Sequence, residues 1–128
     1  MDHSETEMPM PELLNSGAGI ASVVIGLITL FLSAVVYAGL MSTFAYLFSG
    51  PPRMSSGQLA ATQYFFLIME VTIKSGASFV GIAAAIFGLS RSERRKDMAY
   101  VGLALNAILL LSAFVNIGTQ YAMRVLRL

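Results

Sequence analysis

The chain has 128 residues, of which 56% are hydrophobic and 12% charged, and its formal net charge is +1. An ordinary soluble domain has about 25% charged residues, so this composition indicates one integral-membrane domain and excludes a separate soluble module. The small net charge excludes the basic face typical of nucleic-acid binding, and the absence of cysteine excludes disulfides and thiolate metal sites.

Residues 1–16 are predicted to form an acidic, flexible N-terminal tail. The tail carries four carboxylates and no Lys or Arg. A secretory signal peptide begins with a positively charged region, so we expect the apolar segment that follows to be kept as a membrane span. The only histidine, His3, has no second ligand near it in the sequence, and we expect no metal, haem or other cofactor.

The first apolar segment, at about residues 18–48, lies in a stretch of 40 residues, Leu13 to Pro52, without a single Asp, Glu, Lys or Arg. A helix crosses the hydrocarbon core of a bilayer with about 20 apolar residues, so this segment predicts a transmembrane helix. Pro51 and Pro52 end it, because proline has no backbone N–H to donate and cannot continue a helix.

Two further apolar segments follow, at about residues 58–89 and 98–126. The second is preceded by Ser55-x-x-Gln58, the pattern of a capping box, and Asp97 is predicted to cap the third. Each of the three segments has roughly 30 residues and is about 45 Å long as a helix, against about 30 Å of hydrocarbon. Residues 17–128 therefore predict a single all-α domain whose three long transmembrane helices form a small bundle that extends beyond the bilayer on one side.

The distribution of positive charge predicts the orientation. Arg91, Arg94, Arg95 and Lys96 crowd the second break, whereas the first break carries only Arg53. Positively charged loops stay in the cytoplasm. We therefore expect the N-terminus and the 90–97 loop to be cytoplasmic, and the 49–57 loop and the C-terminus to be outside.

Nine of the thirteen aromatic residues fall at or beyond the outer boundary of the bilayer in this arrangement. They are Tyr37, Phe44, Tyr46, Phe48, Tyr64, Phe65, Phe66, Phe114 and Tyr121. A belt of aromatic residues at the membrane interface needs fewer than nine. Two interpretations remain open for the surplus: packing against a partner protein, or packing in the core of this chain's own bundle.

Glu70 and Lys74 are the only charged residues inside the second apolar segment. They are four residues apart, with Glu first, which places them on one helix face in the better orientation for an ion pair. Ionisable groups inside a membrane are candidates for function, so handling of ions or protons is one interpretation. The other is a structural or partner-facing salt bridge near the headgroups, which Lys74 reaches by extending outward.

Asn106, near the middle of the third segment, is expected to form a hydrogen bond with a neighbouring helix. Small residues also recur at intervals of four, as Ala18, Ser22 and Gly26 and again as Ala77, Gly81 and Ala85. This spacing allows helix backbones to approach closely, and it predicts tight packing within this chain or with another.

The sequence GIASVVIGL at 19–27 returns as GIAAAIFGL at 81–89, with five of nine positions identical. Continued to Leu111 through the basic turn, the second copy resembles a family of small, glycine-rich bacterial membrane domains of unknown function, in which two apolar helices flank a short basic turn. The resemblance covers about a third of the chain, and the charged pair and the aromatic segment depart from it. It implies a bacterial inner membrane and no particular chemistry.

These observations favour a non-catalytic accessory subunit of a larger bacterial inner-membrane complex, in contact with the bilayer and with other integral membrane subunits. With no cysteine, one histidine and one intramembrane carboxylate, no catalytic set can be assembled in the membrane. One alternative is a subunit of an oligomeric channel or transporter, a homo-oligomer in which Glu70, Asn106 and Gln120 line a shared pore. Another is a membrane-embedded regulatory or immunity-type protein that acts through its acidic tail or outer loop.

Overall fold

The computed structural model describes residues 16–50, 54–91 and 94–126. They form three α-helices: α1 (Gly17–Phe48), α2 (Ser56–Ser90) and α3 (Asp97–Val125), and no strand is present among them. The helices have 32, 35 and 29 residues. The predicted all-α bundle of three long helices is confirmed, with boundaries within two residues of those expected.

Each helix is long and apolar enough to cross a membrane. At 1.5 Å per residue the three helices measure roughly 44 to 52 Å, which exceeds the hydrocarbon thickness of about 30 Å. The chain is therefore a multi-pass membrane protein whose helices are longer than the hydrocarbon core.

Two helix starts follow from their capping residues. The Ser16 hydroxyl accepts a hydrogen bond of 3.0 Å from the Gly19 N–H, so Ser16 ends the predicted tail as the buried N-cap of α1. The rest of the tail lies outside the described residues. At α2, both bonds of the predicted capping box form between Ser55 and Gln58.

The prediction that Asp97 caps α3 is wrong. Lys96 occupies the N-cap position without a capping side chain, and Asp97 is the first helical residue. Its carboxylate accepts a hydrogen bond of 2.6 Å from Arg95. A negative charge in the first turn still interacts favourably with the helix dipole, which accounts for an acidic residue at this place.

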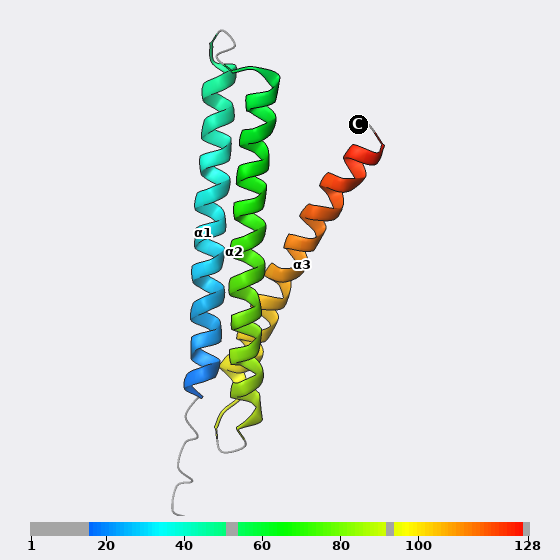
Figure 1. Cartoon of the computed structure of the whole chain (residues 1–128). Coiled ribbons are helices and arrows are strands. Elements are labelled where there is room, and N and C mark those ends of the chain that lie inside the picture. Colours follow the sequence, from blue (N-terminus) through cyan, green and yellow to red (C-terminus); the bar gives the residue numbers. More distant parts are fainter. Residues whose placement is uncertain (1–15, 51–53, 92–93, 127–128) are drawn as a thin grey trace, which may run out of the picture.

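The helices α1 and α2 lie antiparallel along their length, while α3 packs against the end of the pair that carries the basic loop and then leans away (Figure 1). Two halves follow from this arrangement. We call the half next to the basic loop the basic half, and the half with the ends of α1 and α3 and the start of α2 the distal half.

The core of the basic half is built from small residues. Apart from the N-cap, the buried positions are Gly19, Ser22, Gly26, Thr29, Ser33 and Val36 of α1, Ser78, Gly81, Ala85 and Gly88 of α2, and Ala99, Gly102, Asn106, Leu109 and Ala113 of α3. The large apolar side chains point outward instead, as Phe31, Phe79 and Ile108 do. Lipid tails are as apolar as leucine, so close backbone contact between small residues, rather than burial of large ones, holds the helices together.

The repeated glycines meet in this core. A Cβ on Gly88 would come within 3.2 Å of the Gly19 backbone. A Cβ on Gly26 would collide with the Leu105 side chain, and a Cβ on Gly81 would collide with the Asn106 side chain. The two copies of the repeat thus run antiparallel and present their glycines to each other and to α3. Gly81 and Ala85, predicted as packing positions, both lie in this contact within the chain.

Candidate functional site

Asn106 links all three helices at the centre of the basic half. Its side chain is fully buried, and Nδ2 donates hydrogen bonds to the Ser22 carbonyl of α1 at 2.9 Å and to the Gly102 carbonyl of its own helix at 2.8 Å. The Ser22 hydroxyl in turn donates to the Gly81 carbonyl of α2 at 2.6 Å. The interhelical hydrogen bond expected of Asn106 is therefore present, and it belongs to the bundle's own core.

The oxygen of the Asn106 side-chain amide, Oδ1, lies against Gly81. Oδ1 is buried and has no hydrogen-bond partner among the described residues, and a Cβ on Gly81 would collide with it. The position that a Cβ would take beside Gly81 is therefore occupied by the Asn106 amide. Glycine at position 81 therefore makes the room that the amide needs.

Glu70 and Lys74 form the predicted ion pair on α2. Lys74 Nζ lies 2.5 Å from Glu70 Oε1, and the two side chains keep only 12% and 16% exposure, Lys74 first. Asn116 of α3 donates to the same oxygen at 3.4 Å. The pair is thus more enclosed than a lysine extending freely to the headgroups would be, and it is joined to α3.

A cavity of about 490 Å³ lies next to this pair, in the distal half where α3 diverges. Its lining residues are Tyr37, Leu40 and Phe44 from α1, Ala60, Gln63, Tyr64, Leu67 and Glu70 from α2, and Asn116, Gln120 and Met123 from α3. Ligand sites for small molecules have volumes of roughly 300 to 1,000 Å³. The cavity is therefore large enough for a small ligand or for part of a lipid.

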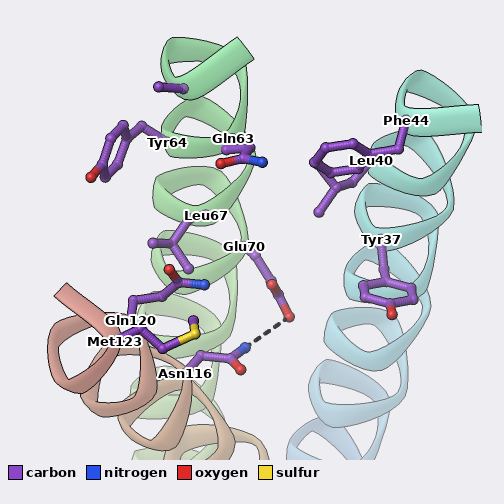
Figure 2. A pocket seen from close by; sticks show the side chains of 11 residues that line it. Tyr37, Leu40, Phe44, Gln63, Tyr64, Leu67, Glu70, Asn116, Gln120 and Met123 are labelled. Carbon is purple, nitrogen blue, oxygen red and sulfur yellow. Dashed lines mark hydrogen bonds between the residues drawn. The ribbon is translucent and has the colours of Figure 1, made fainter. Parts of the chain in front are cut away.

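The cavity has two unlike walls (Figure 2). The α1 wall consists of two aromatic rings and a leucine, whereas the wall from α2 and α3 carries a carboxylate and three carboxamides beside Ala60, Tyr64, Leu67 and Met123. Glu70 extends from α2 into the space between the walls. Both of its interactions with described residues use Oε1, and Oε2 forms no hydrogen bond with the part of the chain that the structure describes.

Arg124 and Tyr64 connect α3 to α2 near the far end of the cavity. The Arg124 guanidinium lies 4.5 Å from the centre of the Tyr64 ring, within the range of a cation–π interaction. Together with the Glu70–Asn116 hydrogen bond, this contact connects α3 to α2 beyond the buried core.

The nine distal aromatic residues are mostly exposed. Phe44 is partly buried in the cavity wall, and Phe66 is partly buried against Gly39. The other seven, Tyr37, Tyr46, Phe48, Tyr64, Phe65, Phe114 and Tyr121, keep 43% to 78% of their exposure. Of the two interpretations left open by the sequence, a core of this chain's own bundle therefore does not account for these seven.

The remaining candidates lie at the opposite end. Arg94, Arg95 and Lys96 are exposed in the basic loop, and none of them lines the cavity. Asn106 is likewise separated from the cavity, which holds Glu70 and Gln120. The three residues proposed to line a shared pore are therefore not on one surface.

Sequence reasoning missed the apolar part of the cavity lining, because Leu40, Leu67 and Met123 look like ordinary membrane-facing residues. The polar wall carried a usable signal, since Asn116 and Gln120 are four residues apart and so share a helix face. Among the described residues, no three His, Cys, Asp or Glu side chains gather in a group that could hold a metal ion.

No protein-family profile, curated protein or solved structure matches the chain.

Proposed function

We propose that the protein is a non-catalytic accessory subunit of a larger bacterial inner-membrane complex, which it stabilises or joins by helix packing. The seven exposed aromatic residues of the distal half carry this proposal. Exposed apolar patches beyond a few hundred Å² are characteristic of interaction sites, and aromatic residues are enriched where proteins meet.

The position of these residues supports a protein partner as well as lipid. Phe48 is 78% exposed at the end of α1, 31 residues from Gly17 and so about 47 Å along the helix. If the basic end sits at one membrane boundary, Phe48 lies well beyond the other, where no lipid tail covers it. Partner subunits that extend outside the bilayer would bury such a ring.

The test is purification from native membranes in a gentle detergent, followed by native mass spectrometry. We expect recovery with unlike subunits in a fixed stoichiometry, and we expect Phe48→Ser together with Phe65→Ser to release them. A matched pair on lipid-facing positions of the basic half, Phe31→Ser and Phe79→Ser, serves as the control. Recovery of the chain alone would contradict the proposal.

The cavity favours a second candidate, a subunit of an oligomeric channel or transporter. Glu70, Asn116 and Gln120 line one open space between the helices, as polar groups along a transport path do. In proteoliposomes, flux of protons or ions that is lost in Glu70→Gln and kept in Asp97→Asn would favour this function. The regulatory or immunity-type alternative gains no support from the described residues.

A further inference from the structure

We propose that the distal cavity binds the neutral, hydroxyl-bearing headgroup of a glycosyl lipid. This inference is independent of the accessory-subunit proposal. It depends on the chemistry of the two cavity walls, on the charge balance at Glu70 and on the depth of the cavity along the bundle.

The charge balance favours an uncharged headgroup. Among the described residues, Glu70 is the only charged one that lines the cavity, and Lys74 already neutralises it at 2.5 Å. A cation would add an uncompensated charge to the balanced pair, and an anion would meet the carboxylate. A neutral group that donates a hydrogen bond to the unoccupied Oε2 leaves the pair intact.

The polar wall suits hydroxyl groups in particular. The carboxamides of Gln63, Asn116 and Gln120 each offer both donors and acceptors, which is what a set of neighbouring hydroxyls requires. The carboxylate of Glu70 accepts only. Four such groups on one side of a cavity can take several hydroxyls of one sugar ring at once.

The opposite wall suits the other side of the same ligand. A pyranose ring has polar edges and a face of C–H groups, and Tyr37, Phe44 and Leu40 of α1 provide an aromatic and apolar surface across from the polar groups (Figure 2). A cavity with polar groups on one side and an apolar surface on the other is complementary to a sugar ring.

The depth of the cavity favours a sugar attached to a lipid over a free sugar. Glu70 lies 20 residues from Ser90, at the basic end of α2, and so about 30 Å along the helix. That distance is one hydrocarbon thickness, which places the cavity at the level of the headgroups. An attached chain then continues along the exposed apolar faces of the helices.

The experiment is equilibrium dialysis of radiolabelled octyl β-glucoside, below its critical micelle concentration, against the full chain in phosphatidylcholine nanodiscs, with empty nanodiscs subtracted. We expect saturable binding of one molecule per chain. Octyl tetraethylene glycol ether has the same tail and only one hydroxyl, and we expect it to compete at least tenfold more weakly. Methyl β-glucoside, which has no tail, is expected to compete weakly as well.

Two variants assign the binding to the cavity. Ala60→Leu places a larger side chain in the cavity lining from an exposed helical position and is expected to weaken saturable binding without loss of helicity. Glu70→Gln together with Lys74→Met keeps the site neutral, removes the carboxylate, and is expected to weaken binding about tenfold. Thr119→Leu, an exposed α3 residue outside the cavity lining, is the control and should bind as the unmodified chain does.

Equal competition by the ether would overturn the proposal, because the cavity would then select only a tail. Equal competition by methyl β-glucoside would also overturn it, since the site would then take a free sugar. Binding that is unchanged both in Ala60→Leu and in the Glu70→Gln, Lys74→Met variant would place the ligand elsewhere.

Discussion

The packing of the basic half depends on the absence of a side chain at position 81. We expect Gly81→Ala to lower the free energy of unfolding by about 1 to 3 kcal/mol, the range for overpacking a filled core, because the new methyl group collides with the Asn106 amide. Thermal unfolding in detergent, followed by circular dichroism, measures the change.

Gly76 supplies the matched control on the same helix. A Cβ at Gly76 meets nothing within 4 Å, so Gly76→Ala is expected to stabilise α2 by about 0.5 to 1 kcal/mol through its better helix propensity. An equal loss of stability in both variants would contradict the role given to Gly81.

The contact between Gly81 and Asn106 also predicts that their substitutions are not additive. Asn106→Ala alone should cost about 0.6 to 2 kcal/mol, the range for a hydrogen bond between membrane helices. Because the smaller side chain removes the collision, Gly81→Ala should cost less in that background than alone. A double-mutant cycle measures this coupling, and strictly additive costs would rule out the contact.

At the scale of one helix, the capping box predicts where α2 opens first. Ser55→Ala removes the acceptor for the Gln58 N–H and should cost about 0.5 to 2 kcal/mol. Hydrogen exchange of the amides in the first turn of α2 should accelerate, whereas exchange near Gly81 should not change. Ser56→Ala, one residue later and without a capping bond, is the control, and equal acceleration in it would argue against the box.

The divergence of α3 predicts that the two halves of this helix differ in mobility. Since the chain has no cysteine, spin labels can be placed cleanly at Ala83 and Ala104 in the basic half and at Ala61 and Ala122 in the distal half, all exposed positions. Pulsed electron–electron double resonance should give a narrow distance distribution for the pair in the basic half and a broader one for the pair in the distal half.

The Arg124–Tyr64 contact gives a further prediction about the mobility of the distal half of α3. Tyr64→Leu removes the ring under the guanidinium, so it should broaden the distal distribution further and leave the basic-half distribution unchanged. An unchanged distal distribution would show that this contact does not hold α3.

The three helices could be predicted from the sequence, but their arrangement in space could not. Helix ends depend on local sequence: charge-free runs, the Pro51–Pro52 break and the Ser55 capping box can be recognised without a partner helix. All six helix ends were predicted to within two residues. The lean of α3 depends on which side chains meet across helices, such as Gly102 against Ser22. That pairing is non-local, and so the cavity was not predicted, although Glu70 and Gln120, which line it, were both candidates from the sequence.

At the scale of the whole molecule, the basic residues predict a single orientation. Single cysteines at Ser49 and Ser90 lie at opposite ends of the bundle, and both positions are exposed. In intact bacterial cells, a membrane-impermeant maleimide should label Ser49→Cys at once and Ser90→Cys only after the membrane is permeabilised. The reverse pattern would place the basic loop outside.

The position of Asn106 has a consequence for biosynthesis. While only α1 and α2 have entered the membrane, the Ser22 hydroxyl can already reach the Gly81 carbonyl, but the space beside Gly81 stays empty and the Ser22 carbonyl lacks the Asn106 donor. The last helix to be synthesised brings the side chain that fills the space beside Gly81 and adds a second donor at the Ser22 carbonyl. The hairpin of the first two helices therefore lacks part of its packing until translation of α3 completes it.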